Sequence, residues 1–403
     1  MIQLGIIREE KKPSDSRVPF TPKQCRQLLE QYNNELNIVV QPSPWRCFAD
    51  QEYLQAGITL SEDLSNCNWL AGVKEVPPTL LQEEKNYLFF SHTIKKQAYN
   101  RPLLQMALQK NIRLVDYECL THNDGTRILG FGHFAGIVGA HNGLLVYGKK
   151  TGAFDLKPAY QCHNYDEIKN SYKQLQLPPI RMVLTGTGRV SKGTKEVLDL
   201  LKITQIDPQT YLSQTFDKPV YTLLNSAELY QRKSDLGYDR AEFHREPAKY
   251  QSRFLPFAYQ TDLMFNGIYW HPDAPVFFTK EDMRSPKFAI KVIADITCDI
   301  NGSIPATTRA TSIMQPVMGY NPVNEQEEAP YQAHTIDIMA VDNLPNELPR
   351  DASEMFGSQL VKHIIPEIIA PQSDIIQRAS ITLKGKLTDR FEYLQDYAEG
   401  NLR

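Results

Sequence analysis

The chain has 403 residues, of which 41% are hydrophobic and 23% charged, and 44 Lys+Arg against 47 Asp+Glu leave a formal net charge of −3. This composition excludes a disordered chain, a collagen and a coiled coil, and the length favours two domains. Because there is no basic excess, neither a nucleic acid nor a membrane is expected as a partner. We expect small-molecule ligands.

The N-terminus and the cysteines indicate the compartment. The first ten residues reach charge after seven positions and lack the apolar run of a signal peptide. The most apolar later stretch, 131–147, is interrupted by His133, His141 and Asn142 and is too short for a membrane span. The six cysteines show no Cys-x-x-Cys spacing, so we expect no metal site and a cytoplasmic protein.

Short apolar runs alternate with helical patterns along the chain, which predicts an α/β fold. The first region is expected to contain strands at 1–7, 37–41, 69–73, 87–90 and 113–117 and a helix at 21–32. A long helix at 131–147 leaves this region, and a strand at 180–184 opens a second one. A further strand is expected at 336–341. We predict domain segments 1–140, 141–330 and 331–403, with the last segment returning to the first domain.

The strongest local pattern is Val183-Leu184-Thr185-Gly186-Thr187-Gly188-Arg189-Val190-Ser191-Lys192-Gly193, in which a strand runs through a glycine turn into a helix. Glycines let backbone N–H groups approach a pyrophosphate, and a helix N-terminus favours its negative charge. Gly186, Thr187, Gly188, Arg189, Val190 and Ser191 are therefore predicted to bind a dinucleotide. Ser191 occupies the usual third glycine position, where a small side chain keeps the helix close to the strand.

Two aspartates are further candidates for cofactor contacts. Asp207 lies 21 residues after Gly186, near the distance at which an acid accepts hydrogen bonds from a ribose. Its alternative role is to begin the loop before Pro208. Asp295 and Asp299 follow an apolar strand, and either could orient a cofactor or cap a helix. Asp299, which lies past the strand end, is the better candidate.

Three basic side chains follow strands of the first region. Arg17 lies between the first strand and the first helix, Lys74 follows the strand at 69–73, and His92 follows the strand at 87–90. A guanidinium can grip a carboxylate through two hydrogen bonds, and a lysine with a histidine can transfer protons near neutral pH. Each residue taken alone could equally be a solvated residue at a strand end, and Arg17 could pair with a nearby acid.

Taken together, these residues resemble a known family. The segments around Arg17, Lys74 and His92 are similar to the alanine dehydrogenase, transhydrogenase and saccharopine dehydrogenase superfamily. Segments 131–139, 185–193, 266–270, 295–303 and 341–350 resemble its lysine-ketoglutarate reductase branch, which forms saccharopine.

The resemblance implies two Rossmann-like doubly wound domains flanking a cleft, with NAD or NADP as the cofactor. It implies that Arg17 binds a substrate carboxylate, that Lys74 and His92 orient substrate and act as acid and base, and that Asp299 lies near the nicotinamide. The implied reaction couples lysine reductively to 2-oxoglutarate, or reverses that coupling, in the manner of a saccharopine dehydrogenase.

Two alternatives keep other functions open. One is an alanine-dehydrogenase-like enzyme that forms a smaller amino acid from ammonia and a 2-oxo acid. The other is a catalytically silent scaffold that binds the cofactor, although a scaffold has no need of Lys74 and His92. The expected partners are an amino acid and a 2-oxo acid, and a homo-oligomer is compatible with these features.

Overall fold

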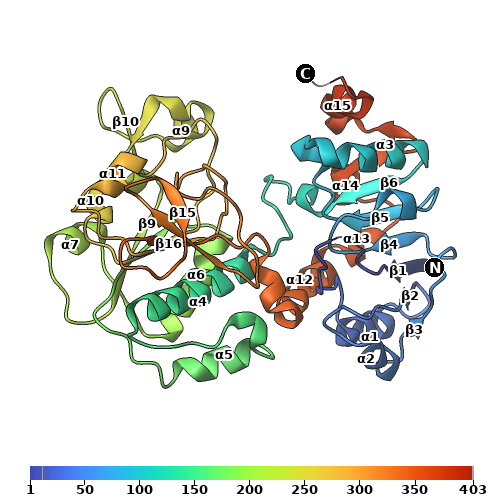
Figure 1. Ribbon diagram of the computed structural model, residues 1–403. Coiled ribbons are helices and arrows are strands. Elements are labelled where there is room, and N and C mark those ends of the chain that lie inside the picture. The colour runs from blue at the N-terminus through green and yellow to red at the C-terminus, as the bar shows by residue number, and fades with distance from the viewer. Residues whose placement is uncertain (11, 402–403) are drawn as a thin grey trace. The chain divides into compact units, whose positions relative to one another are not determined.

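The computed structural model describes residues 1–10 and 12–401, which form two units (Figure 1). Unit 1 consists of Met1–Phe131 and the described residues from Pro349 onward, and unit 2 is the continuous segment Gly132–Leu348. The chain therefore passes from one unit to the other twice. In the part of the chain that the structure describes, no helix combines the length and apolarity needed to traverse a lipid bilayer.

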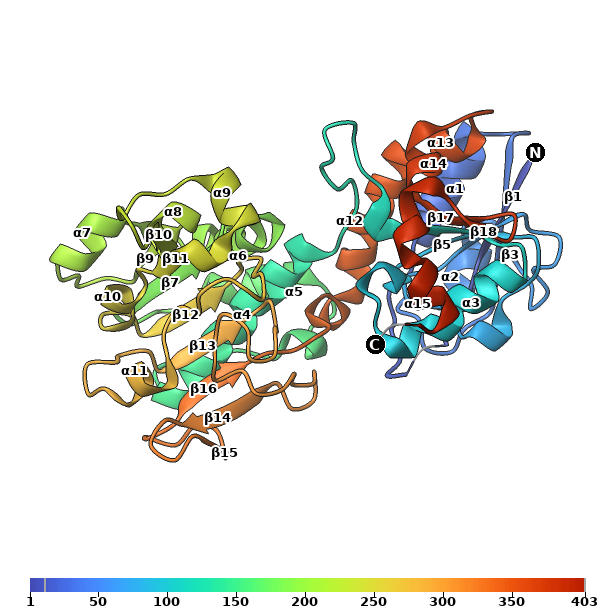
Figure 2. The ribbon, with the colours of Figure 1, turned by 90° about the horizontal axis from the view of Figure 1, so that it is seen from above.

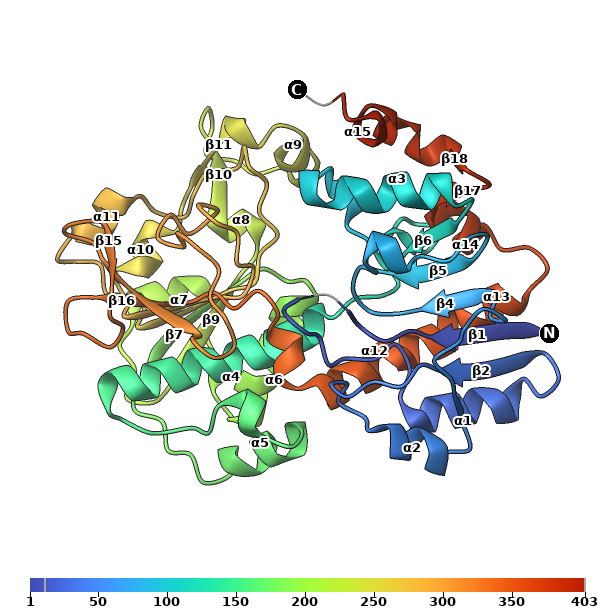
Figure 3. The same cartoon turned by 45° about the vertical axis from the view of Figure 1, so that its right-hand side comes forward.

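Unit 1 is built on an eight-stranded sheet with the order β18-β17-β6-β5-β4-β1-β2-β3 (Figure 3). The strands β1 to β6 are parallel, whereas β17 runs antiparallel to β6 and β18 antiparallel to β17. Their bounds are β1 Ile2–Ile6, β2 Leu36–Val40, β3 Thr59–Leu60, β4 Trp69–Ala71, β5 Asn86–Phe89, β6 Arg113–Asp116, β17 Ser380–Leu383 and β18 Lys386–Leu387. Two segments far apart in the sequence thus share one sheet.

The helices of unit 1 also come from both segments. They are α1 Pro22–Gln31, α2 Asp50–Gln55, α3 Arg101–Gln109, α12 Pro349–His363, α13 Ile365–Ile369, α14 Asp374–Ala379 and α15 Gln395–Glu399. A capping box of Thr21 and Gln24 begins α1. The Gln24 amide also donates to the Glu354 carbonyl at 2.8 Å, which joins α1 to α12. At the other end of the sheet, α15 lies beside α3 in all three views (Figures 1–3).

Unit 2 contains a second eight-stranded sheet, with the order β15-β14-β16-β13-β12-β7-β9-β8. Six strands are parallel, and β14 and β15 form an antiparallel addition beside β16 (Figure 2). The bounds are β7 Arg181–Thr185, β8 Thr204–Gln205, β9 Val220–Leu224, β12 Leu263–Asn266, β13 Val292–Asp295, β14 Val317–Asn321, β15 Gln326–Glu328 and β16 Ile336–Met339. A separate hairpin joins β10 Tyr230–Arg232 to β11 Tyr250–Ser252.

The helices of unit 2 include a long buried one that packs closely on its neighbour. They are α4 Gly132–Thr151, α5 Tyr165–Tyr172, α6 Arg189–Leu200, α7 Pro208–Ser213, α8 Ser226–Leu229, α9 Arg240–Arg245, α10 Leu255–Ala258 and α11 Lys280–Arg284. A Cβ atom on Gly136 of α4 would lie 1.9 Å from the Val190 carbonyl oxygen, and one on Gly193 of α6 would lie 1.9 Å from the His133 carbonyl oxygen. Both positions therefore require glycine if α4 and α6 are to cross this closely.

The predicted fold class, α/β with two Rossmann-like doubly wound units, is confirmed. The units divide at 131/132 and 348/349 rather than at residues 140 and 330. The first boundary differs because the whole of α4 packs within unit 2, against α6, β12 and β13. The second differs because β16 pairs with β13 and β14, so residues 331–348 belong to the second sheet and not to the returning segment.

Candidate active site

The three basic residues predicted for substrate chemistry follow three adjacent strands of unit 1. Arg17 lies in the loop after β1, Lys74 in the loop after β4, and His92 in the loop after β5. In the sheet, β4 lies between β1 and β5, and all three strands are parallel. Their carboxyl ends therefore share one edge, where ligands of open α/β sheets bind.

The Arg17 guanidinium is buried, with 3% of the residue exposed. Its Nε and Nη2 atoms donate to the two Asp15 carboxylate oxygens at 2.9 and 2.6 Å, and its Cζ atom lies 4.1 Å from the centre of the Phe131 ring. A planar guanidinium suits both the bidentate contact and the stacking. Arg17 is therefore a fixed, desolvated cation rather than a surface residue.

The His92 ring is held by a buried carboxylate. Its Nδ1 atom lies 2.5 Å from Glu75 Oε1, and Glu75 is itself buried. The Phe90 ring stacks beside the imidazole, with centroids 6.2 Å apart. When Nδ1 carries the proton that faces Glu75, Nε2 is the nitrogen that can accept another proton. The backbone of His92 has a φ of 54°, an uncommon conformation for a residue other than glycine.

Four acids of this edge were missed by the sequence analysis: Glu9, Asp15, Glu75 and Asp116, all of which are buried. Asp116 accepts a hydrogen bond from the Ser91 amide at 3.0 Å and another from the Ser91 hydroxyl. Burial raises the pKa of Asp116. Each of the four acids ends a strand or lies in the loop that follows one, so the strand-end rule used for Arg17, Lys74 and His92 could have found them.

The glycine loop of unit 2 connects β7 to α6 as predicted from the sequence. Gly186 has a φ of +88°, and a Cβ atom there would lie 3.0 Å from the Gly267 carbonyl oxygen and from Ser191 Oγ. Gly188 is the N-cap of α6, and a Cβ atom there would meet nothing within 4 Å. The open space at Gly188, beside exposed Thr187 and Arg189, fits a pyrophosphate at the start of a twelve-residue helix.

The third glycine of the usual pattern allows close packing of the helix, and in this chain Ser191 and Gly193 each provide one of the contacts involved. The buried Ser191 hydroxyl donates to the Thr185 carbonyl at 2.9 Å and so ties the first turn of α6, where Val190 also lies, to the end of β7. Gly193 instead provides the close approach of α6 to α4. The altered spacing of the pattern is thus compatible with a closely packed helix.

The structure does not bring Asp207 beside the glycine loop. Asp207 is the exposed N-cap of α7, where its carboxylate accepts from the Thr210 amide at 3.0 Å. It follows β8, which is separated from β7 by β9. The end of β9 borders the loop directly, because the Gly186 amide donates to the Leu224 carbonyl at 2.8 Å. Asn225, which follows β9, therefore lies nearer to the glycine loop along this sheet edge than Asp207 does.

Asp299 lies in the half-buried loop after β13, at the same edge of the sheet as the glycine loop. The chain turns there, since the Gly302 amide donates to the Asp299 carbonyl at 2.9 Å. Asp295, the other candidate, is fully buried at the end of β13 and accepts from Thr307 Oγ1 at 2.6 Å. Asp295 is therefore part of the interior, and Asp299 is the more accessible of the two.

A buried polar network supports the ends of three adjacent strands in unit 2. Asn266 at the end of β12 accepts from the Thr185 hydroxyl at 2.8 Å and donates to Asp295 at 2.8 Å and to Ser303 Oγ at 2.9 Å. Thr185 ends β7 and Asp295 ends β13. Satisfied networks of this kind rigidify the elements that they join. This network therefore fixes the ends of β7, β12 and β13 relative to one another, next to the glycine loop that follows β7. The sequence analysis did not predict it.

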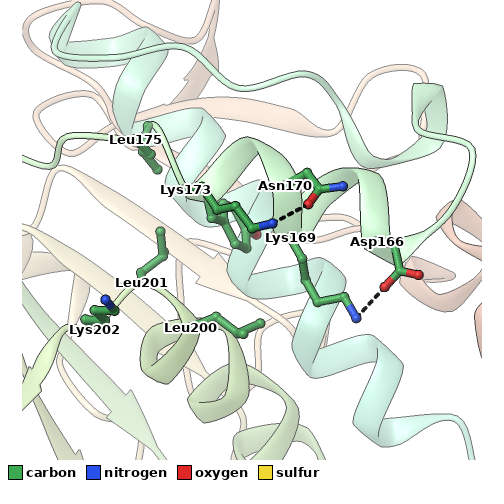
Figure 4. Close-up of a pocket in the computed structure, with 9 residues that line it drawn as sticks. Asp166, Lys169, Asn170, Lys173, Leu175, Leu200, Leu201 and Lys202 are labelled. Carbon is green, nitrogen blue, oxygen red and sulfur yellow. Dashed lines mark hydrogen bonds and ion pairs between the residues drawn. The ribbon is translucent and has the colours of Figure 1, made fainter.

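A pocket of about 720 Å³ lies between α5 and the C-terminal end of α6 (Figure 4). It is lined by Asp166, Lys169, Asn170, Tyr172, Lys173, Leu175, Leu200, Leu201 and Lys202. Two of its lysines already have partners, since Lys169 pairs with Asp166 and Lys173 donates to Asn170. Because α6 is about 18 Å long, this pocket is far from the glycine loop at the other end of the helix.

The sequence of the chain is similar to one family model and to several known enzymes. Residues 5–138, which include Arg17, Lys74 and His92, match the family model of the alanine dehydrogenase/PNT N-terminal domain. The chain is 32% identical, over 99% of its length, to the mitochondrial alpha-aminoadipic semialdehyde synthase of Rattus norvegicus. It is 25% identical, over 89% of its length and 90% of the relative's, to a saccharopine dehydrogenase (NAD(+), L-lysine-forming) of Emericella nidulans.

The chain resembles the alanine dehydrogenase and saccharopine dehydrogenase superfamily. It spans 48% of the length of the rat synthase, about half of that relative. The fold is similar to that of an L-alanine dehydrogenase, which matches with a TM-score of 0.66 at 16% identity over the whole of both chains. A transhydrogenase from Sinorhizobium meliloti matches with a TM-score of 0.58 at 12% identity, over 96% of this chain and 100% of that one.

Proposed function

We propose that the chain is a nicotinamide-dependent oxidoreductase that couples lysine to 2-oxoglutarate, giving saccharopine, or runs the reverse reaction. The observation that carries the proposal is the placement of Arg17, Lys74 and His92 after three adjacent parallel strands. The names of the semialdehyde synthase and saccharopine dehydrogenase relatives support the choice of substrates.

Arg17 is the proposed partner of the 2-oxo acid carboxylate. Its planar guanidinium carries a fork of N–H donors that matches the two oxygens of a carboxylate. Asp15 and Phe131 hold the plane in one orientation. A cation held in this way loses little side-chain freedom when the substrate binds.

Lys74 and His92 are the proposed proton-transfer groups. The amine of the substrate must lose a proton to attack the ketone, and the ketone oxygen must gain protons to leave as water. His92 Nε2 can accept or give a proton while Glu75 holds the ring through Nδ1. Lys74 is half-buried and follows the strand next to that of His92.

The glycine loop is the proposed dinucleotide site, with the backbone N–H groups of Gly188 to Ser191, at the start of α6, facing the pyrophosphate. A bound nicotinamide would supply the hydride that reduces the carbon–nitrogen bond. Asp299 is proposed to lie near the nicotinamide, and Asn225 rather than Asp207 near the adenosine ribose. Both NAD and NADP remain candidates for the cofactor.

A substrate panel, followed at the nicotinamide absorbance band with both cofactors, tests the proposal. We expect turnover with lysine plus 2-oxoglutarate, or with saccharopine in the reverse direction. The match of residues 5–138 to the alanine dehydrogenase/PNT domain favours a second candidate, an oxidoreductase for a smaller amino acid. Turnover with ammonia plus pyruvate alone would select that candidate, and no turnover with any pair would favour a silent cofactor-binding scaffold.

A further inference from the structure

Glu9 is a buried acid that joins three loops at the carboxyl edge of the unit 1 sheet. It follows β1, and 7% of the residue is exposed. Its Oε1 atom accepts from the Val73 amide at 2.5 Å, and its Oε2 atom accepts from the Lys74 amide at 3.1 Å. Its backbone carbonyl accepts from the Trp45 indole at 2.8 Å, in the loop after β2.

The contact with the loop after β4 uses both carboxyl oxygens of Glu9 on two successive backbone N–H groups. When Glu9 is ionised, these two hydrogen bonds are roughly twice as strong as hydrogen bonds between neutral groups. These two hydrogen bonds fix the peptide planes on both sides of the Val73 Cα atom. Because the second of these planes leads into Lys74, the direction in which the Lys74 side chain leaves the backbone depends on Glu9. An acceptor with one oxygen could satisfy only one of the two N–H groups.

Charged groups at the carboxyl edge of the unit 1 sheet interact electrostatically with Glu9. Burial and the neighbouring Asp15 carboxylate raise the pKa of Glu9 to about 8, while the Val73 and Lys74 amides and the Arg17 guanidinium act in the opposite direction. Tyr117, which follows β6, also faces this charge. Glu9 therefore lies between the proposed carboxylate-binding group and the proposed proton-transfer group.

We propose that Glu9 is a positioning residue: through its two hydrogen bonds to the loop after β4, it holds the Lys74 amine at a fixed distance from the Arg17 guanidinium. This inference rests on the proposed function, because it assigns Lys74 a part in the reaction. Glu9 itself makes no contact with substrate in this role. Its effect is to keep the amine and the guanidinium at a fixed separation, and a misplacement of about 1 Å costs an enzyme about 100-fold in rate.

The test is a double-substitution cycle with E9Q and Lys74→Met, using the substrate pair that wild type turns over. We expect E9Q to lower kcat by about 10- to 100-fold. The KM for the 2-oxo acid and the Kd of the cofactor should change little. In the Lys74→Met background, E9Q should cause no further loss, because both substitutions act through the same group. A full additional loss would show a general structural effect and would overturn the inference.

Two further measurements keep the result interpretable. Glu10→Gln changes the adjacent acid, which pairs with Arg8, and should retain the wild-type kcat. Hydrogen exchange should show that the Val73 and Lys74 amides are both protected in wild type and that one of them loses protection in E9Q, because Gln has a single acceptor oxygen. If E9Q does not fold, E9D, which keeps the carboxyl group on a shorter side chain, takes its place in the cycle. Wild-type kcat in a folded E9Q or E9D rejects the inference alone, whereas absence of turnover by wild type rejects the proposed function.

Discussion

The Gly186 amide donates a hydrogen bond of 2.8 Å to the Leu224 carbonyl, so the end of β9 touches the glycine loop. Asp207 follows β8, which lies on the far side of β9. Strands in a sheet are about 4.8 Å apart, which places β8 about 10 Å from β7. We therefore propose Asn225, which directly follows Leu224, rather than Asp207 as the residue that would meet the adenosine ribose of a bound dinucleotide.

Substitutions at these two positions should behave differently. Asp207→Ala should leave the Kd of the cofactor unchanged and lower the thermal stability slightly, because only the cap of α7 is lost. Asn225→Asp keeps an oxygen for the Ala227 amide but adds a charge, so it should weaken NADPH binding by about tenfold relative to NADH. Fluorescence titration with both cofactors measures the change. A higher Kd for Asp207→Ala would restore Asp207 as the ribose contact.

The two glycines of the loop should also separate binding from stability. Gly188→Asp should abolish cofactor binding in a folded protein, because a side chain has space there but its charge repels a pyrophosphate. Gly186→Ala should cost about 1–2 kcal/mol of stability, because its φ of +88° is left-handed. Thermal melts and cofactor titrations of both variants provide the check. Unchanged cofactor affinity in Gly188→Asp would remove the dinucleotide assignment.

Arg17→Lys should raise the KM for the 2-oxo acid by about 10- to 100-fold, because an ammonium cannot reproduce the planar fork shared with Asp15. The Kd of the cofactor should stay unchanged. Arg26→Lys provides the control, since Arg26 pairs with Glu30 on the surface of α1. A wild-type KM for every carboxylate substrate would leave Arg17 a purely structural role.

Lys74→Met and His92→Gln should each lower kcat by about 10²- to 10⁴-fold, the usual effect of a positioned acid or base. Each variant should lose one limb of the pH–rate profile and retain its cofactor affinity. The double variant should lose less than the product of the single losses, because residues that act together are not additive. His122→Gln, at an exposed position of unit 1, is the control. Wild-type turnover in both single variants would show that the site is elsewhere.

Glu347 should make stability depend on pH. It is buried and accepts from the Asn142 amide at 2.8 Å, and burial raises its pKa from 4.5 to about 7. A raised pKa means that the folded state holds the proton more tightly, so this stability is present below about pH 4.5 and is lost as pH rises through 7. Glu347→Gln is neutral throughout and should gain Tm relative to wild type between about pH 5 and about pH 8. Parallel Tm curves for the two proteins would contradict this.

The sequence allowed the prediction of residues whose role follows from their position after a strand or in a glycine turn. Arg17, Lys74, His92 and the loop from Gly186 to Ser191 lie where the pattern indicated. The acids that hold them, such as Glu75 beside His92, depend on which loops meet at the sheet edge. Asp207 had the expected spacing, but β9 occupies the place between β8 and β7. Spacing along the chain does not encode the order of strands in a sheet.

The antiparallel pairing of β17 with β6 has a consequence for synthesis on the ribosome. The sheet of unit 1 is finished only by Ser380–Leu383 and Lys386–Leu387, whereas Gly132–Leu348 contains every strand of the other sheet. The inserted unit can therefore fold while the nascent chain still lacks the last strands of the unit that encloses it in sequence. Until then β6 presents an open edge, and unpaired edges are where nascent chains associate wrongly. A chaperone that binds the emerging protein would be expected to protect this edge.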